Sequence, residues 1–135
     1  MKLVVRPARF DDYPKLCSFD EFLGDRRIDM QKGELYVCDC PDEQAVGYLK
    51  LSTEHFFDWP MVVILCVKES SRRMGVGSKL LRFASQFEHL PRLYVSTEAS
   101  NDPMRKLLAD EGASEIGYID LLNLDEEREL LYRLK

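Results

Sequence analysis

A continuous apolar stretch, rich in β-branched residues, occupies residues 62–67 and is typical of a buried strand. The chain then turns polar and passes through Gly75-Val76-Gly77. Beyond these glycines, apolar side chains recur at helical spacing, at Leu80, Phe83, Ala84 and Phe87. The pattern predicts a strand, a tight loop and a helix, with two glycines where the helix begins.

Shorter apolar and polar alternations precede this unit. Asp11 and Asp12 are candidate caps for a helix that continues to about Phe22. Pro41-Asp42-Glu43 has the composition of a turn, which makes the strands on either side of it a hairpin. An aromatic loop at residues 55–60 leads into the central strand. The other elements expected here are a strand at residues 3–5, a helix at 27–32, and strands at 35–38 and 45–51.

The last third of the chain predicts a helix between strands. Asp102 is suited to cap this helix, and Pro103 fits its first position. Its apolar stripe is formed by Met104, Leu107 and Leu108. Strands are expected at residues 93–97, 116–122 and 130–134. A charged loop at residues 125–129 joins the last two strands, and the predicted order is β-α-α-β-β-β-α-β-α-β-β.

Length and charge narrow the class of protein. The chain has 135 residues and a formal net charge of −5, which predicts a single domain over residues 1–135. It lacks a transmembrane-length apolar run and a signal-peptide core, so we expect a cytoplasmic protein that does not enter membranes. The acidic balance argues against general nucleic-acid binding. It is compatible with a cationic acceptor, although such a balance more often only keeps a protein soluble.

The four cysteines, at positions 17, 38, 40 and 66, form no C-x-x-C pair, and the two histidines are not placed as zinc partners. We therefore expect no metal site. Cys38 and Cys40 are two apart on a predicted strand, so their side chains share a face. A reactive pair is one interpretation, and reduced structural thiols are the favoured one.

The start of the central helix has the chemistry of an anion site. The first amides of a helix lack intrahelical partners, and the helix dipole adds positive charge there. Glycine lets a bulky anion approach the backbone, and Arg72 and Arg73 add charge. A P-loop is excluded because Gly75 and Gly77 are too close together, and a Rossmann fingerprint because its third glycine would fall on Leu80. A phosphate or pyrophosphate is therefore the expected ligand.

The run Arg72-Arg73-Met74-Gly75-Val76-Gly77 reads R-x-x-G-x-G and resembles the acetyl-CoA motif of the GNAT N-acetyltransferase superfamily. The order of elements also resembles that family, most closely over residues 61–134. Two segments, 57–60 and 100–104, resemble a bacterial branch of unassigned substrate. The resemblance implies an α/β (α+β) fold with a mixed, mostly antiparallel sheet of six or seven strands and three or four helices. In that fold the sheet splays between the central strand and the next.

The same resemblance implies acetyl-CoA as the acyl-donor cosubstrate. Its pantetheine chain would lie along the strand end at Leu65, Cys66 and Val67. Its pyrophosphate would lie on backbone amides of Arg72, Arg73, Met74, Gly75, Val76, Gly77 and Ser78. Asn101 matches a family asparagine that contacts the cofactor. The sequence departs from the family pattern at one position. Many relatives carry a tyrosine near the thioether sulfur, and the corresponding residue here is Leu108.

The reaction implied is direct acetyl transfer to a primary amine of a small molecule or protein in a ternary complex. An alkylamine has a reference pKa of about 10.4, so a base must take its proton. Glu98 is the first candidate, followed by Glu54 and His55. Tyr118 is an alternative proton donor, with cross-strand packing as its competing role. Cys66 is disfavoured as a nucleophile because its strand is expected to be buried.

Two classes of function stay open, an active N-acetyltransferase and a non-catalytic acyl-CoA-binding or interaction module. The missing tyrosine favours the second class. The acceptor is expected to enter between the aromatic loop and the acidic loop at residues 125–129, where a solvated charge run is the competing interpretation. Phe56, Phe57 and Trp59 are equally compatible with pocket, core and homodimer contacts. The sequence does not name the acceptor.

Overall fold

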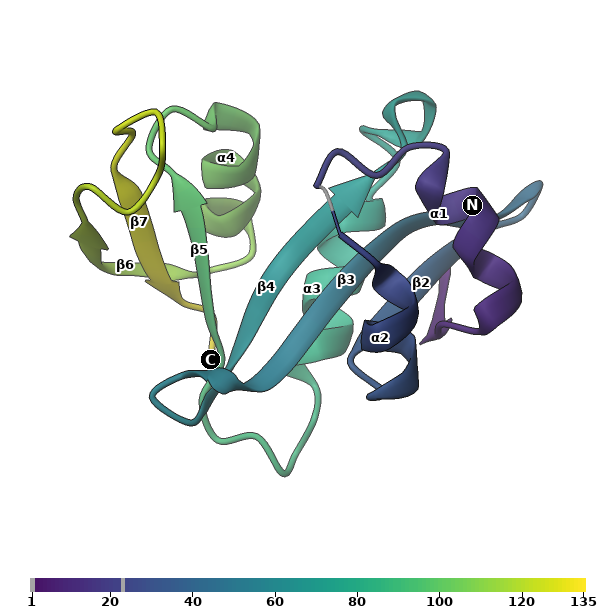
Figure 1. Ribbon diagram of the computed structural model, residues 1–135, viewed down its shortest axis with the longest axis horizontal. Helices are drawn as coiled ribbons and strands as arrows, with labels where there is room; N and C mark the ends of the chain where they lie inside the picture. Colours follow the sequence, from purple (N-terminus) through teal and green to yellow (C-terminus); the bar gives the residue numbers. More distant parts are fainter. Residues whose placement is uncertain (1, 23) are drawn as a thin grey trace.

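The computed structural model describes residues 2–22 and 24–135, with the side chain of His55 also outside the description (Figure 1). Its strands are β1 (Val4–Pro7), β2 (Leu35–Cys40), β3 (Glu43–Phe56), β4 (Trp59–Val67), β5 (Tyr94–Glu98), β6 (Ser114–Ile119) and β7 (Glu129–Arg133). Its helices are α1 (Tyr13–Cys17), α2 (Arg26–Gln31), α3 (Val76–Ser85) and α4 (Asp102–Asp110), with 3₁₀ turns at Phe10–Asp12 and Glu69–Ser71.

The strands form one seven-stranded sheet in the order β1-β2-β3-β4-β5-β7-β6. Among the strand pairs of the described residues only β4 with β5 is parallel, and every other neighbouring pair is antiparallel. Parallel neighbours need a crossover connection, and α3 supplies it between β4 and β5. The predicted fold class, a mixed and mostly antiparallel sheet with flanking helices, is confirmed.

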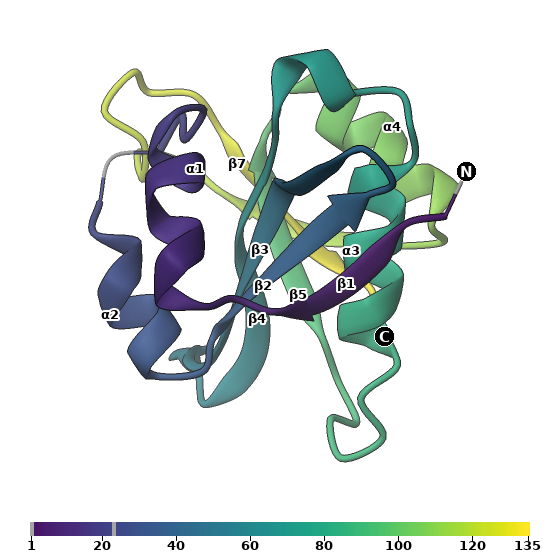
Figure 2. The ribbon, with the colours of Figure 1, turned by 90° about the vertical axis from the view of Figure 1, so that its right-hand side faces the viewer.

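Helices cover both faces of the sheet, with α1 and α2 on one side and α3 and α4 on the other (Figure 2). The α3 side carries the larger apolar cluster, which includes Leu80 and Leu81 of the helix and Val62 of β4. The α1 side carries a smaller cluster around Leu16, Tyr48 and Cys66. Because β4 contributes to both clusters, it is the buried central strand that its apolar run predicts.

Two local predictions in the first half of the chain are wrong. The helix expected to reach Phe22 ends at Cys17. Beyond it, the carboxylate of Asp20 accepts hydrogen bonds from the Phe22 amide and from Arg26, and so stabilises a turn in place of further helix. The aromatic loop is instead the tip of the β3–β4 hairpin, where Phe56 pairs with Trp59. The two residues of the turn, Phe57 and Asp58, both have positive φ, as a type I′ turn requires.

The cysteines are all free thiols. Cys38 is buried and Cys40 half-buried, and both contact the α3-side cluster, so the predicted shared face is observed. A bulge between them interrupts the pairing of β2 with β3. Within residues 2–22 and 24–135, no helix is long and apolar enough to cross a membrane.

Candidate active site

The central strand and its neighbour separate as they leave the sheet. β4 pairs with β5 at only two positions, Met61 with Tyr94 and Val62 with Val95. On its other side, β4 continues to pair with β3 as far as Val67. Figure 1 shows β4 and β5 diverging toward the end that carries the start of α3. The β5-facing edge of residues 63–67 therefore has no strand partner in the described part of the chain, as the splay implied by the resemblance requires.

The side chains at this strand end point into the two cores. Leu65 and Val67 contact the α3-side cluster, whereas Cys66 lies in the α1-side cluster with 3% of its surface exposed. Burial raises the pKa of the Cys66 thiol, so it stays protonated at neutral pH. This geometry agrees with the prediction that Cys66 is not a nucleophile. It leaves the backbone of this strand end as the part that can meet a ligand.

The first turn of α3 is open. Its cap residue is Gly75, which has a left-handed φ of 83° and forms no side-chain cap. The first helical hydrogen bond that reaches Gly75 comes from the amide of Lys79 to the Gly75 carbonyl. The amides of Val76, Gly77 and Ser78 precede that bond, and the first amides of a helix have no intrahelical acceptor. The start of α3 thus has the free N–H groups of an anion site.

Glycine is required at the two positions of the motif for different physical reasons. Gly75 provides the left-handed conformation, which costs a side-chain-bearing residue roughly 1–2 kcal/mol. Gly77 provides space, because a Cβ there would come within 2.9 Å of Leu107 Cδ2 in α4. Only the first glycine therefore shapes the anion site directly. The second sets how closely α3 approaches α4.

The side chains around this turn carry positive charge. An open cavity of about 350 Å³ beside it is lined by Leu3, Gly75, Ser78, Lys79 and Arg82. Arg73 is exposed and Met74 is half-buried against the α3-side cluster. A larger cavity of about 450 Å³ is lined by residues of β2 and β3 and by Phe87, His89 and Leu90, which follow α3. It therefore lies at the other end of the helix from the open turn.

Arg72 has partners within the chain that its sequence context does not predict. Its Nε donates to the carbonyl of Val67 at 3.1 Å, and its guanidinium forms an ion pair with Glu21. Arg72 thus joins the end of β4 to the segment between α1 and α2. Glu21 lies 51 residues away in the chain, and no local pattern could have revealed this contact.

Asn101 caps α4. Its Oδ1 accepts a hydrogen bond from the Met104 amide at 3.2 Å. The expected cap, Asp102, is instead the first residue of the helix, and Pro103 follows it in the first turn. The cap prediction was therefore wrong by one residue. The side-chain oxygen that the family resemblance would direct at the cofactor is here bonded to the helix.

Glu98 lies at the end of β5, on the side where the sheet opens. It pairs with Glu129 of β7 and is half-buried. Burial raises the pKa of the Glu98 carboxyl, and the negative charges of Asp125, Glu129 and Glu127 raise it further. A carboxyl whose pKa is moved toward neutrality is suited to accept a proton. The acidic loop thus contributes to the environment of this candidate base.

The structure does not bring Tyr118 to Glu98. Tyr118 pairs with Leu130 and Glu98 pairs with Glu129, and consecutive residues of a strand face opposite sides of the sheet. Tyr118 is 56% exposed, and the guanidinium of Arg128 lies over its ring at 3.7 Å from the centroid. Its observed surroundings are those of a surface cation–π pair.

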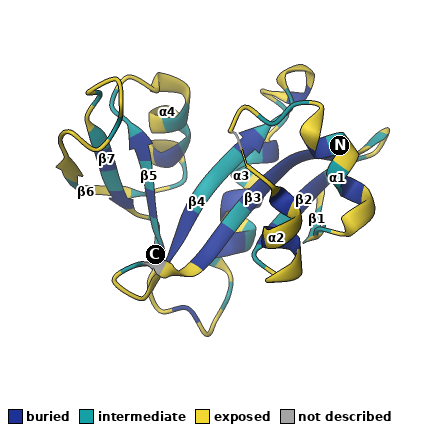
Figure 3. Ribbon diagram, viewed as in Figure 1, coloured by how far each residue is buried: buried dark blue, intermediate teal, exposed yellow. Residues whose placement is uncertain are grey.

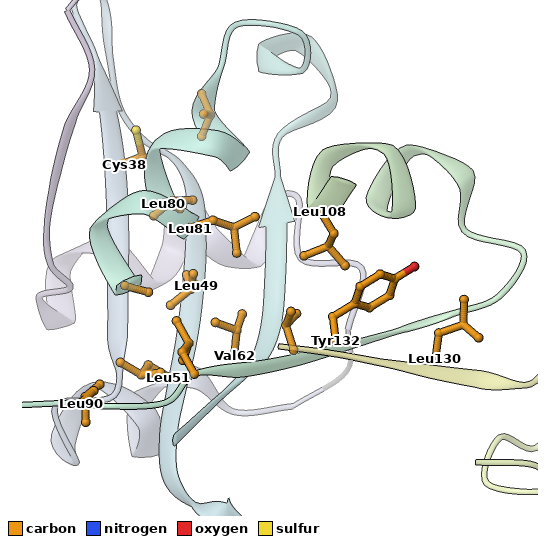
Figure 4. Packing of buried hydrophobic residues seen from close by; sticks show 14 of the residues in the cluster. Cys38, Leu49, Leu51, Val62, Leu80, Leu81, Leu90, Leu108, Leu130 and Tyr132 are labelled. Atoms are coloured by element: carbon orange, nitrogen blue, oxygen red, sulfur yellow. The ribbon is translucent and has the colours of Figure 1, made fainter. Parts of the chain in front are cut away.

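Leu108 is part of the core. It is fully buried and belongs to the α3-side cluster. Figure 4 shows it beside Tyr132, whose ring is buried and whose hydroxyl donates to Glu115 Oε1 at 3.4 Å. The apolar stripe predicted for this helix is therefore correct at Leu108. The residue that stands at the family's tyrosine position holds α4 against the sheet.

The structure separates the aromatic segment from the acidic loop. The hairpin tip with Phe57 and Trp59 lies at the start of β4, whereas the sheet opens at its end. The nine residues of β4 span eight steps of about 3.3 Å, which places its two ends roughly 26 Å apart. At this tip the ring centroids of Phe56 and Tyr94 lie 5.0 Å apart. Glu54, near the same tip, is exposed. The aromatic segment therefore lies at the closed end of the β4–β5 pair and not at the end where Glu98 lies, and entry of an acceptor between it and the acidic loop stays a prediction. The His55 side chain lies outside the description.

No group of three or more metal-ligating side chains occurs in the described part of the chain. The site consists of a free strand edge, an open helix start and a half-buried carboxyl.

Known proteins share this architecture. The chain resembles a GNAT-family acetyltransferase from Bacillus cereus with 23% identity and a TM-score of 0.88, over 100% of this chain and 98% of that one. A Bacillus anthracis protein in complex with acetyl coenzyme A has 16% sequence identity and a TM-score of 0.82, and the match covers 99% of this chain and 98% of that one. The ribosomal-protein-S18-alanine N-acetyltransferase of Escherichia coli has 16% sequence identity and a TM-score of 0.76, and the match covers 98% of this chain and 93% of that one.

Among curated proteins, none matches the sequence. The model of the acetyltransferase (GNAT) family matches residues 4–112, which include the splayed strands, the open turn of α3 and all of α4. This chain belongs to the acetyltransferase (GNAT) family.

Proposed function

We propose that residues 1–135 act as a single domain that transfers the acetyl group of acetyl-CoA to a primary amine. The observation that carries this proposal is the meeting of two unpaired backbone surfaces at one end of the sheet. One is the β5-facing edge of β4 at residues 63–67. The other is the uncapped start of α3. An extended chain with amide groups suits the first surface, and a pyrophosphate suits the second.

The residues present fit acetyl-CoA. Along the edge at residues 65–67, Leu65 and Val67 direct their backbone groups away from β3, whereas those of Cys66 face Tyr48 of β3, and all three side chains are directed into the two cores. Val76, Gly77 and Ser78 offer amides, and Lys79 and Arg82 add charge beside them. The Bacillus anthracis structure with acetyl coenzyme A supports this choice of ligand. When bound, acetyl-CoA supplies an activated thioester.

Glu98 is proposed as the general base. It removes a proton from the ammonium group of the acceptor, so that the nitrogen lone pair becomes available for attack. Its raised pKa makes it a better proton acceptor than an ordinary surface carboxylate. Asp125, Glu127 and Glu129, which act on Glu98 electrostatically, would also attract a cationic amine. The Escherichia coli N-acetyltransferase among the similar structures supports an amine as acceptor.

The strand edge has a second role in this proposal. Backbone N–H groups near Cys66 and Val67 donate to the carbonyl oxygen as negative charge develops on it. Because Tyr118 is on the other face from Glu98, water is the proposed source of the proton for the leaving thiolate. A thiol with a reference pKa of about 8.5 leaves tolerably at neutral pH without a dedicated acid. We also propose a cytoplasmic location, where thiols stay reduced.

A second candidate is a non-catalytic acyl-CoA-binding module. The observation that favours it is the pair of Leu108 and Tyr118, since the first lacks a hydroxyl and the second is exposed on the far face. Both candidates keep the cofactor site, so ligand binding alone does not separate them.

A panel of primary amines with acetyl-CoA, followed by release of free thiol, tests the two. The proposal predicts turnover with at least one cationic amine, and loss of that turnover in Glu98→Gln with acetyl-CoA affinity unchanged. Glu54→Gln, an exposed carboxyl near the hairpin tip, is the matched control and should keep its activity. Binding of acetyl-CoA without thiol release from any amine would favour the non-catalytic module.

A further inference from the structure

Exposed apolar side chains are concentrated near β6. Among the described residues, twelve large apolar side chains are exposed, and six of them fall within nine consecutive positions. These six are Ile116, Tyr118, Ile119, Leu121, Leu122 and Leu124. Figure 3 shows β6 and the segment after it mostly in the colour of exposed residues. Apolar side chains therefore gather on both faces of this edge strand and along the segment after it, and such a concentration of exposed apolar surface marks an interaction site.

β6 is also an edge of the sheet. The two edge strands are β1 and β6. β1 carries Arg6, held by Asp12 and Asp39, and ends in Pro7. These are features with which edge strands avoid pairing with other chains. β6 reads Ser-Glu-Ile-Gly-Tyr-Ile, without lysine, arginine or proline, and of the features that protect edges it has only Glu115 and the bulge beside it. Its outer row of backbone groups is therefore available to a further strand.

We propose that the β6 edge pairs, antiparallel and about a two-fold axis, with β6 of a second copy of this chain. Full overlap of the six residues sets Ser114 opposite the partner's Ile119 and Glu115 opposite the partner's Tyr118. Opposed residues in an antiparallel pair lie on one face of the sheet. The pairing thus requires that Glu115 and Tyr118 share a face, and that Ser114 and Ile119 share the other.

The bulge in β6 meets that requirement. Glu115 pairs with Tyr132 and Tyr118 with Leu130, so these two residues of β6 share a face. The remaining pair lies on the opposite face, since Ser114 and Ile119 are set against Arg133 and Glu129. In a regular strand, residues three or five positions apart would face opposite sides. The register shift between Glu115 and Gly117 makes the face pattern symmetric about the middle of the strand.

Charge complementarity favours a second copy over an unrelated partner. The guanidinium of Arg128 covers the Tyr118 ring and donates to both carboxylate oxygens of Asp120, and it remains 46% exposed for a further carboxylate. In the proposed register, Glu115 of one copy therefore approaches Arg128 of the other. The two-fold axis repeats this contact, so the edge is complementary to itself. Glu115 keeps capacity for this role, because its side chain is 52% exposed and both of its contacts are long, 4.0 Å to Arg105 and 3.4 Å from the Tyr132 hydroxyl.

Sedimentation equilibrium of the full chain tests the proposal. We expect a species of twice the 15.7 kDa chain mass, in equilibrium with the monomer. The double substitution Ile116→Lys with Ile119→Lys should give a monomer with an unchanged circular dichroism spectrum. Ile28→Lys, at an exposed position on α2, is the matched control and should remain a dimer. A wild-type chain that stays monomeric up to millimolar concentration overturns the proposal, as does a dimer that persists in the double variant.

A charge exchange tests the register independently of folding effects in the apolar patch. Glu115→Arg sets two arginines together across the interface and should weaken the dimer by about tenfold or more. Adding Arg128→Glu together with Asp120→Asn should restore the wild-type dissociation constant, because the contact is then reversed in sign and the new carboxylate no longer faces the charge of Asp120. Failure of these added substitutions to restore affinity contradicts the proposed pairing of Glu115 with the partner's Tyr118.

Discussion

The helices α3 and α4 begin at equivalent positions in the fold, but the free amides of their first turns are capped differently. Each follows a strand of the diverging pair, α3 after β4 and α4 after β5. At α4, the side chain of Asn101 accepts the Met104 amide and Pro103 removes a donor from the first turn. At α3, Gly75 has no side chain to offer, and the amides remain open. One helix start is closed by its own sequence, and the other is left for an external anion.

This difference assigns separate roles to the two helices. α4 contributes packing through the fully buried Leu108. α3 contributes packing through Leu80 and Leu81 and, in addition, an anion site at its first turn. Substitutions should therefore divide into those that lower stability and those that lower affinity for acetyl-CoA.

Leu108→Ala should lower the free energy of unfolding by roughly 2–5 kcal/mol, because it removes a fully buried side chain and leaves a cavity. The measurement is urea denaturation followed by circular dichroism. Leu108→Met conserves volume and should cost about 1.5 kcal/mol or less. If Leu108→Ala keeps its stability while the turnover number collapses, then Leu108 shapes the reaction and the packing role is wrong.

Gly75→Asp should weaken acetyl-CoA binding by about 100-fold or more, since a carboxylate would occupy the anion site and cap the helix that must stay open. Calorimetric titration gives the affinity. Gly112→Asp is the matched control, because Gly112 has a similar φ of 80° with no atom near its missing Cβ. Both variants carry the same backbone strain. Equal loss of affinity in the two would show that strain, and not charge at α3, is responsible.

Asn101→Ala should cost about 1 kcal/mol of stability, the usual effect of losing a helix cap. We expect its acetyl-CoA affinity to fall much less than that of Gly75→Asp. Thermal unfolding and titration of the same sample measure both quantities. An unchanged melting temperature combined with lost affinity would contradict the capping role and support the cofactor contact that the family resemblance implies.

The dependence of kcat/KM on pH tests the role of Glu98 as general base, and the expected effect is smaller than those above. A general base must be ionised, so kcat/KM should rise with pH as Glu98 loses its proton, at a pH above the ordinary glutamate pKa of about 4.3. Replacing Asp125 and Glu127 by Asn and Gln removes two of the charges that raise the Glu98 pKa. The rise should then move to lower pH. Glu126→Gln, outside the charges that act on Glu98, should leave the profile in place.

The sequence predicted most of what lies near the central strand. The apolar run of β4, the two glycines and the helical spacing after them are local signals, and each corresponds to an observed element. Local signals were also sufficient for α2 and for the apolar stripe of α4. They were insufficient for α1, where Asp20 forms bonds with Tyr48 and Arg26 and so ends the helix early.

The relations between distant residues could not be predicted in the same way. The hairpin turn at Phe57 and Asp58 requires positive φ at two residues that are rarely found there. The opposite orientations of Glu98 and Tyr118 depend on strand register, which includes a bulge in β6. The bond of Arg72 to Val67 and its ion pair with Glu21 depend on the tertiary fold. The nature of the site was predictable, whereas the positions of its charged groups were not.

The central claim is that the open start of α3 and the free edge of β4 together bind acetyl-CoA. Calorimetric titration of the wild-type chain with acetyl-CoA, beside Gly75→Asp and Gly112→Asp, tests it most directly. The account predicts saturable binding at one site in the wild type and in Gly112→Asp, with a raised melting temperature. In Gly75→Asp the affinity should be lower by about 100-fold or more, and the melting temperature should not rise at the acetyl-CoA concentration that saturates the wild type. Absence of heat and of thermal stabilisation in the wild type at high acetyl-CoA concentration would contradict the account.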